Sequence, residues 1–85
     1  MPESRNTDAN LLALGQAVRQ LRLRRGMSTD ELATATGITR RRIDALEEGR
    51  VDPAYDLLLA LADGLRIEPS ALVILTEQLK TSDEP

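Results

Sequence analysis

Three consecutive arginines, at positions 40–42, are the residues of this chain best suited to bind another molecule. Each guanidinium carries a fixed positive charge and several N–H donors, which suit phosphate groups and the acceptors on a guanine edge. A helix turns by about 100° per residue, so three adjacent side chains point in different directions and have different roles. The alternative is a solvated helix face on which Asp44 pairs with Arg40 or Arg41 at helical spacing.

The composition lacks the residue types most often used in catalysis and metal binding. The 85 residues include no cysteine and no histidine, which removes the usual zinc ligands, the thiol nucleophile and the commonest general base. Tyr55 is the only aromatic residue, which argues against stacking of nucleic-acid bases on aromatic side chains. We therefore expect no enzyme activity, no metal and no cofactor.

Charge is unevenly distributed along the chain. The formal net charge is −3, but residues 19–50 contain eight arginines and five acidic residues, a local net charge of +3. The rest of the chain carries a net charge of −6. Binding to nucleic acid requires a basic surface rather than a basic average. We expect modest non-specific affinity for DNA, because the acidic remainder weakens the long-range attraction.

Two short helices joined by a turn are expected to hold the three arginines. Ser28 followed by Glu31 is a capping box that starts the first helix, and Gly37 allows the sharp turn. Thr39 can cap the second helix, which is expected over 39–48. Such a pair forms a helix-turn-helix, whose second helix enters the major groove of double-stranded DNA.

Apolar residues at helical spacing predict three further helices. They are expected over 8–25 with a cap at Asp8, over 53–64 with a cap at Asp52, and over 69–80 after Glu68. Gly15 lies within the first of them and is expected to allow close packing of a neighbouring helix.

No strand pattern appears, so the sequence predicts an all-α fold of five helices in one domain. The domain is expected over 8–80. Residues 1–7 are expected to form a flexible N-terminal arm and residues 81–85 a flexible tail. The polar N-terminus is unlike a secretory signal, and the apolar runs are too short to span a membrane, so we expect a cytoplasmic protein with no membrane partner.

The ordered motifs of the chain resemble a known family. They are LG-x-x-VR-x-LR over 14–22, S-x-x-ELA over 28–33, G-I-T over 37–39, I-x-x-LE-x-G over 43–49 and L-x-x-LA over 58–62. Together they are similar to the λ-repressor/Cro type of helix-turn-helix, also called the xenobiotic-response-element family. The resemblance implies a compact five-helix domain that acts as a dimeric, sequence-specific transcriptional regulator, with repression as the expected role.

The resemblance also implies roles by position, and the arginine pattern adds to them. The expected base-contacting residues are Arg40, Arg41, Asp44 and Ala45. The expected DNA-backbone contacts are Ser28, Thr29, Thr39, Arg42 and Arg50. Arg22 and Glu47 match a pair that forms an internal salt bridge in relatives. Arg66 stands where relatives often have glycine, so the bend before the last helix is not expected to depend on glycine.

Two of the base-contacting positions have a second interpretation. Asp44 could accept a hydrogen bond from cytosine N4, but we favour a role in which it braces one of the arginines in a single rotamer. Ala45 could touch a thymine methyl group or could be an ordinary surface alanine.

Val73 and Ile74 bear on the oligomeric state. If the neighbouring leucines fill the core, these two residues leave an apolar patch, which predicts a homodimer through the last helix. The other possibility is that the helix rotates and buries them within one chain.

A second function from another class is a protein-interaction module with weak or no DNA binding. The arginines would then meet an acidic partner protein, and the acidic composition of the chain favours this alternative.

Overall fold

A computed structural model describes residues 2–82 of the chain, with side chains over 9–80. Within that range the chain forms five helices and no strand, so the expected all-α class is confirmed. In chain order the helices are α1 (Pro2–Arg24), α2 (Thr29–Thr36), α3 (Arg40–Glu47), α4 (Tyr55–Leu65) and α5 (Pro69–Ser82).

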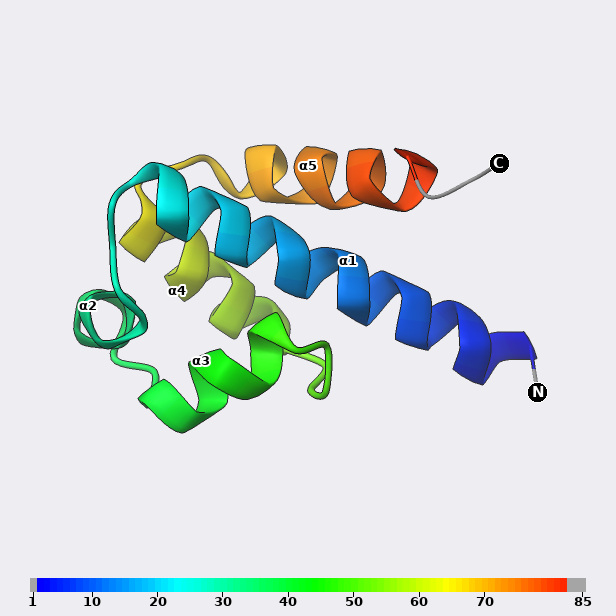
Figure 1. Ribbon diagram of the computed structural model, residues 1–85, viewed down its shortest axis with the longest axis horizontal. Coiled ribbons are helices and arrows are strands. Elements are labelled where there is room, and N and C mark those ends of the chain that lie inside the picture. The colour runs from blue at the N-terminus through cyan, green and yellow to red at the C-terminus, as the bar shows by residue number, and fades with distance from the viewer. Residues whose placement is uncertain (1, 83–85) are drawn as a thin grey trace.

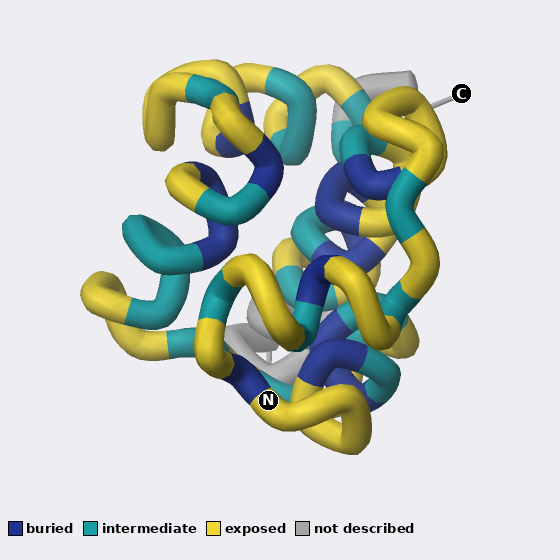
Figure 2. The backbone as a smooth tube through the Cα atoms, turned by 90° about the vertical axis from the view of Figure 1, so that its left-hand side faces the viewer, coloured by how far each residue is buried: buried dark blue, intermediate teal, exposed yellow. Residues whose placement is uncertain are grey.

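The long helix α1 runs through the middle of the molecule (Figure 1). It packs along α5 on one side and against α3 on the other, and α2 and α4 complete the bundle. Buried and exposed residues alternate along the helices, as expected when each helix buries one side (Figure 2). The buried core takes side chains from every helix: Ala17, Val18, Leu32, Ile38, Ile43, Leu46, Leu61, Leu65 and Leu72.

The outer ends of α1 and α5 differ from the sequence expectation. α1 begins at Pro2, so the expected cap at Asp8 is wrong. Residues 2–7 of the arm expected over 1–7 are helical, and the flexibility of that arm stays a prediction. Proline suits the first position of a helix, and no glycine or second proline follows it before the apolar part of α1. α5 continues to Ser82, two residues past its expected end. Met1 and residues 83–85 lie outside the described part of the chain.

The start of α4 also differs from the expectation. The N-cap is Ala54, which has extended backbone angles and makes no side-chain capping bond, so the expected cap at Asp52 is wrong. Val51 packs against the core, and the chain therefore remains in the loop for longer before it enters α4. By contrast, α5 begins at Pro69 as predicted.

The close packing expected at Gly15 is confirmed. A Cβ atom there would lie 2.5 Å from the carbonyl oxygen of Leu46 and 2.6 Å from that of Glu47. Only glycine therefore allows α1 to approach the last turn of α3 so closely. This contact fixes α3 relative to the long helix and places Glu47 beside α1.

Candidate nucleic-acid interface

The helix-turn-helix is held by local hydrogen bonds that its sequence dictates. Ser28 accepts a bond from the Glu31 N–H at 3.0 Å, and the Ser28 N–H donates to the Glu31 carboxylate at 2.7 Å, which completes the capping box. Gly37 has a φ of 77°, and its N–H donates to the Ala33 carbonyl at 2.9 Å. Thr39 accepts from the Arg42 N–H at 3.3 Å and so caps α3. The turn between α2 and α3 is therefore well defined.

The expected backbone-contacting residues Ser28, Thr29 and Thr39 lie together at helix N-termini. Ser28 and Thr39 are the N-caps of α2 and α3, and Thr29 is the first residue of α2. Helix N-termini present N–H groups without intrahelical partners and carry a partial positive charge. The N-terminus of α3 therefore offers a favourable position for a phosphate, whereas the first turn of α2 carries the carboxylates of Asp30 and Glu31.

Arg40 is exposed and lies between two carboxylates from different helices. Its Nη1 atom is 3.4 Å from both carboxylate oxygens of Asp30 on α2, and its Nε atom is 3.8 Å from Oδ2 of Asp44 on α3. Of the two roles expected for Asp44, the geometry matches the brace on an arginine.

Arg41 and Arg42 are exposed on the first turn of α3. Among the described side chains, neither forms an ion pair with an acidic residue. Their guanidinium groups therefore keep their full hydrogen-bonding capacity for another molecule. They are the strongest candidates for direct contact with an anionic or acceptor-rich partner.

Arg50 and Ala45 fit their expected roles less well. The Nε atom of Arg50 donates to Glu48 at 2.8 Å, so this arginine is already paired beside α3. Ala45 is buried, with 8% of its surface exposed, so the alternative of an ordinary surface alanine is wrong, and its contact with a base stays a prediction.

The ion pair expected between Arg22 and Glu47 is present and joins α1 to α3. Arg22 donates from Nε to Oε2 at 2.7 Å and from Nη2 to Oε1 at 3.1 Å, a two-bond pairing. Its Nη1 also donates to the Met27 carbonyl at 2.9 Å, before the start of α2. The hydrogen bond to Glu47 raises the pKa of Arg22, against the opposing effect of burial. This pair fixes the orientation of α3 and is not available to a partner.

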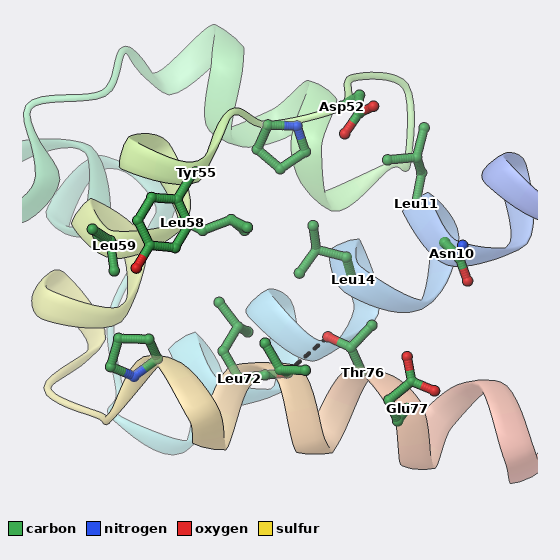
Figure 3. Close-up of a pocket in the computed structure, with 13 residues that line it drawn as sticks. Asn10, Leu11, Leu14, Asp52, Tyr55, Leu58, Leu59, Leu72, Thr76 and Glu77 are labelled. Atoms are coloured by element: carbon green, nitrogen blue, oxygen red, sulfur yellow. Dashed lines mark hydrogen bonds between the residues drawn. The ribbon is translucent and has the colours of Figure 1, made fainter.

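Val73 and Ile74 are both exposed on α5, at 55% and 57%. The alternative in which the helix buries them within one chain is therefore wrong. Val73 lines an apolar groove of about 300 Å³ between α1, α4 and α5. Figure 3 shows Leu14, Leu58 and Leu72 converging on this groove, with Tyr55 beside them.

Sequence reasoning missed the contacts of two residues, Asp30 beside α3 and Arg25 beside the bend after α4. Asp30 pairs with Arg40 across the turn, and nothing in the sequence spacing indicates that pairing. Arg25 donates from Nε to the Leu65 carbonyl and from Nη2 to the Arg66 carbonyl, both at 2.8 Å. Arg66 has a φ of 61°, so the bend after α4 is made without glycine, and Arg25 supports it.

No helix within residues 2–82 is long and apolar enough to cross a membrane.

Comparison with solved structures finds similar proteins. The restriction-modification controller protein C.AhdI from Aeromonas hydrophila is 36% identical with a TM-score of 0.74, over 75% of this chain and 97% of that one. The clp gene regulator ClgR from Corynebacterium glutamicum is 26% identical with a TM-score of 0.84, over 87% and 79%. The controller protein C.Esp1396I has the same fold, with 18% identity and a TM-score of 0.80, over 86% and 95%.

The comparison with family descriptions agrees with the geometry. A helix-turn-helix domain family matches residues 13–73, which is most of the chain. No protein with a curated description matches the chain. The matched span contains α2, the turn and α3, together with the Arg22–Glu47 pair. The chain therefore belongs to the helix-turn-helix domain family, in the λ-repressor/Cro-like class of transcriptional regulators that its motifs resemble.

Proposed function

We propose that the chain is a sequence-specific DNA-binding regulator that places α3 in the major groove. The observation that carries the proposal is the first turn of α3, where three exposed arginines follow one another on a helix held by a cap and a buried ion pair. A rigid, cationic helix end is what readout of a major groove requires. The matched family is one of regulators rather than enzymes, which agrees with this proposal.

The arginines divide the contacts between them. Arg40 and Arg41 reach base edges, where an arginine pairs with the N7 and O6 acceptors of guanine. Arg42 meets a phosphate, together with Ser28, Thr29 and Thr39 at the helix N-termini. Arg50 reaches a phosphate only if it leaves Glu48, so its contribution is smaller. A cytoplasmic location is proposed with this role, since the regulator must reach the DNA that it binds.

The regulator is proposed to act as a homodimer through α5. Val73 and Ile74 present an apolar surface beside the groove lined by Leu58 and Leu72, and a second copy would cover it. Two copies related by a two-fold axis would present two α3 helices to two half-sites, about one turn of DNA apart. C.Esp1396I, which shares the fold, is described as a tetramer in complex with its operator. Repression by blocking a promoter is the simplest outcome of such binding.

A gel-shift assay tests the proposal most simply, with the DNA upstream of the chain's own gene at two salt concentrations. We expect retention at low salt that weakens strongly between about 50 and 200 mM, because each phosphate contact releases counterions. Absence of retention even at low salt would contradict the proposal. It would favour the alternative in which the arginines meet an acidic partner protein.

The dimer is tested by light scattering on the Val73→Glu/Ile74→Glu double variant. We expect the parent to have the mass of a dimer and the variant that of a monomer, because a buried charge without a partner opposes association. Leu23→Glu is the matched control, since Leu23 on α1 has a similar exposure of 56%. A monomeric parent, or a variant as dimeric as the control, would contradict the proposed interface.

A further inference from the structure

We infer that Asp30, a residue of α2 outside the recognition helix, is the positioning residue that sets which base pair Arg40 reads. The inference rests on the proposed function, because it concerns how the same surface selects DNA. It adds a specificity-determining carboxylate from the first helix of the helix-turn-helix.

The contact between Asp30 and Arg40 is made across the turn, between the first turns of α2 and α3. One guanidinium nitrogen, Nη1, is 3.4 Å from each of the two Asp30 oxygens. The Asp44 carboxylate is 3.8 Å from Nε, on the same guanidinium. Two carboxylates from two helices therefore determine the direction in which the side chain of Arg40 extends.

Fold stability does not explain this cluster. All three side chains are largely exposed, with relative accessibilities of 61% for Arg40, 70% for Asp30 and 45% for Asp44. Ion pairs this exposed contribute little to stability, since water and salt screen them. Arg41 and Arg42, in the same turn of α3, form no ion pair with a described acidic residue, so the carboxylates distinguish Arg40 from its two neighbours. The carboxylates therefore matter for what Arg40 binds.

The charges around Arg40 favour a base edge over a phosphate. A phosphate near this guanidinium would also face two carboxylates and would be repelled by them. A guanine edge presents neutral acceptors, N7 and O6, and does not carry that penalty. The cytosine paired with it adds an N4 amino donor, which a neighbouring carboxylate can accept. An arginine held between carboxylates therefore complements a G·C pair better than an A·T pair.

Selection of duplexes from a random-sequence pool tests the inference with four proteins. They are the parent, Arg40→Ala, Asp30→Asn and Asp63→Asn. Asp63, near the end of α4, is an exposed aspartate outside the helix-turn-helix, so its variant controls for the loss of one negative charge. The Arg40→Ala profile identifies the base pair that Arg40 reads, as the position where the parent's preference disappears.

We expect Asp30→Asn to weaken the guanine preference at that same base pair by about fivefold or more, within the range one arginine contact supplies. The other positions of the profile should remain as in the parent, and Asp63→Asn should leave every position unchanged. An Asp30→Asn profile equal to that of Asp63→Asn would overturn the inference while leaving the proposed function intact. A parent that enriches no motif would overturn both.

Two further measurements separate positioning from folding. Thermal unfolding of Asp30→Asn should be close to that of the parent, because asparagine keeps the size of the side chain and the exposed ion pair contributes little to stability. Asp30→Glu restores the charge and should recover most of the guanine preference. If Asp30→Glu is as unselective as Asp30→Asn although both fold, the carboxylate is not the positioning group and the inference is wrong.

Discussion

Two arginine–carboxylate groups in this molecule use the same chemistry in opposite environments. Arg22 and Glu47 lie between α1 and α3, almost fully buried, with two hydrogen bonds of 2.7 and 3.1 Å. Arg40 meets Asp30 and Asp44 on the surface at 3.4 and 3.8 Å. The buried pair is shielded from water, whereas the guanidinium of Arg40 is exposed and can also meet another molecule.

The comparison assigns a different role to each group. Charges removed from water must stay paired, so the buried pair fixes where α3 lies relative to α1. Exposed ion pairs contribute little to stability, so the cluster around Arg40 can direct this side chain without being needed for the fold. One arginine of this fold holds α3 in place, and another is proposed to read a base pair from it.

The largest expected effect is at the buried pair. Glu47→Ala should lower the free energy of unfolding by about 3–5 kcal/mol, because it leaves the guanidinium of Arg22 buried without its carboxylate. Urea denaturation followed by circular dichroism measures the change.

Glu48→Ala is the matched control, because Glu48 is the next residue but is exposed and pairs only with exposed Arg50. It should change the unfolding free energy by less than about 1 kcal/mol. Equal losses for the two variants would show that the buried and exposed pairs do not differ in the way described above.

A smaller loss is expected where α1 and α3 touch. Gly15→Ala should cost about 1–3 kcal/mol of stability, because the added Cβ meets backbone carbonyl oxygens of α3 that cannot move independently. Gln16→Ala, at the exposed next position on α1, is the control and should be nearly neutral. Thermal unfolding of both variants checks the prediction. A Gly15→Ala variant as stable as the parent would show that α1 and α3 can move apart at this contact without loss of stability.

The smallest effect on stability is expected at Arg42, with a distinct effect on binding. Arg42→Ala should leave unfolding within about 0.5 kcal/mol of the parent, because its side chain is exposed and forms no ion pair with the acids of the described chain. The affinity of this variant for DNA should fall by a similar factor for all sequences. The slope of the logarithm of its binding constant against the logarithm of salt concentration should decrease in magnitude by about one. Arg19→Ala, an exposed arginine on α1, removes the same charge and should change the slope less.

The parts of the fold that depend on residues close together in the sequence could be predicted from it. The capping box at Ser28, the cap at Thr39 and the turn at Gly37 are set within a few residues, and the structure forms all three. The family resemblance supplied the Arg22–Glu47 pair, which is formed between residues 25 positions apart.

Features that depend on packing between distant segments could not be predicted. The cap at Asp52 was not used, because Val51 packs against the core and delays the start of α4. Ala45 shares α3 with the exposed arginines but is buried. The contacts of Asp30 with Arg40 and of Arg25 with the end of α4 join different helices, and no short motif marks them.

The most direct test of DNA reading by α3 is the affinity of Arg40→Ala/Arg41→Ala for a duplex selected by the parent protein. Fluorescence anisotropy measures the binding, and thermal unfolding of the same samples checks the fold. Each arginine–guanine contact supplies about 1–3 kcal/mol of discrimination, so the variant should lose about 100-fold in affinity or more while it unfolds like the parent. A folded variant that binds the duplex as tightly as the parent would contradict the assignment of α3 as the recognition helix.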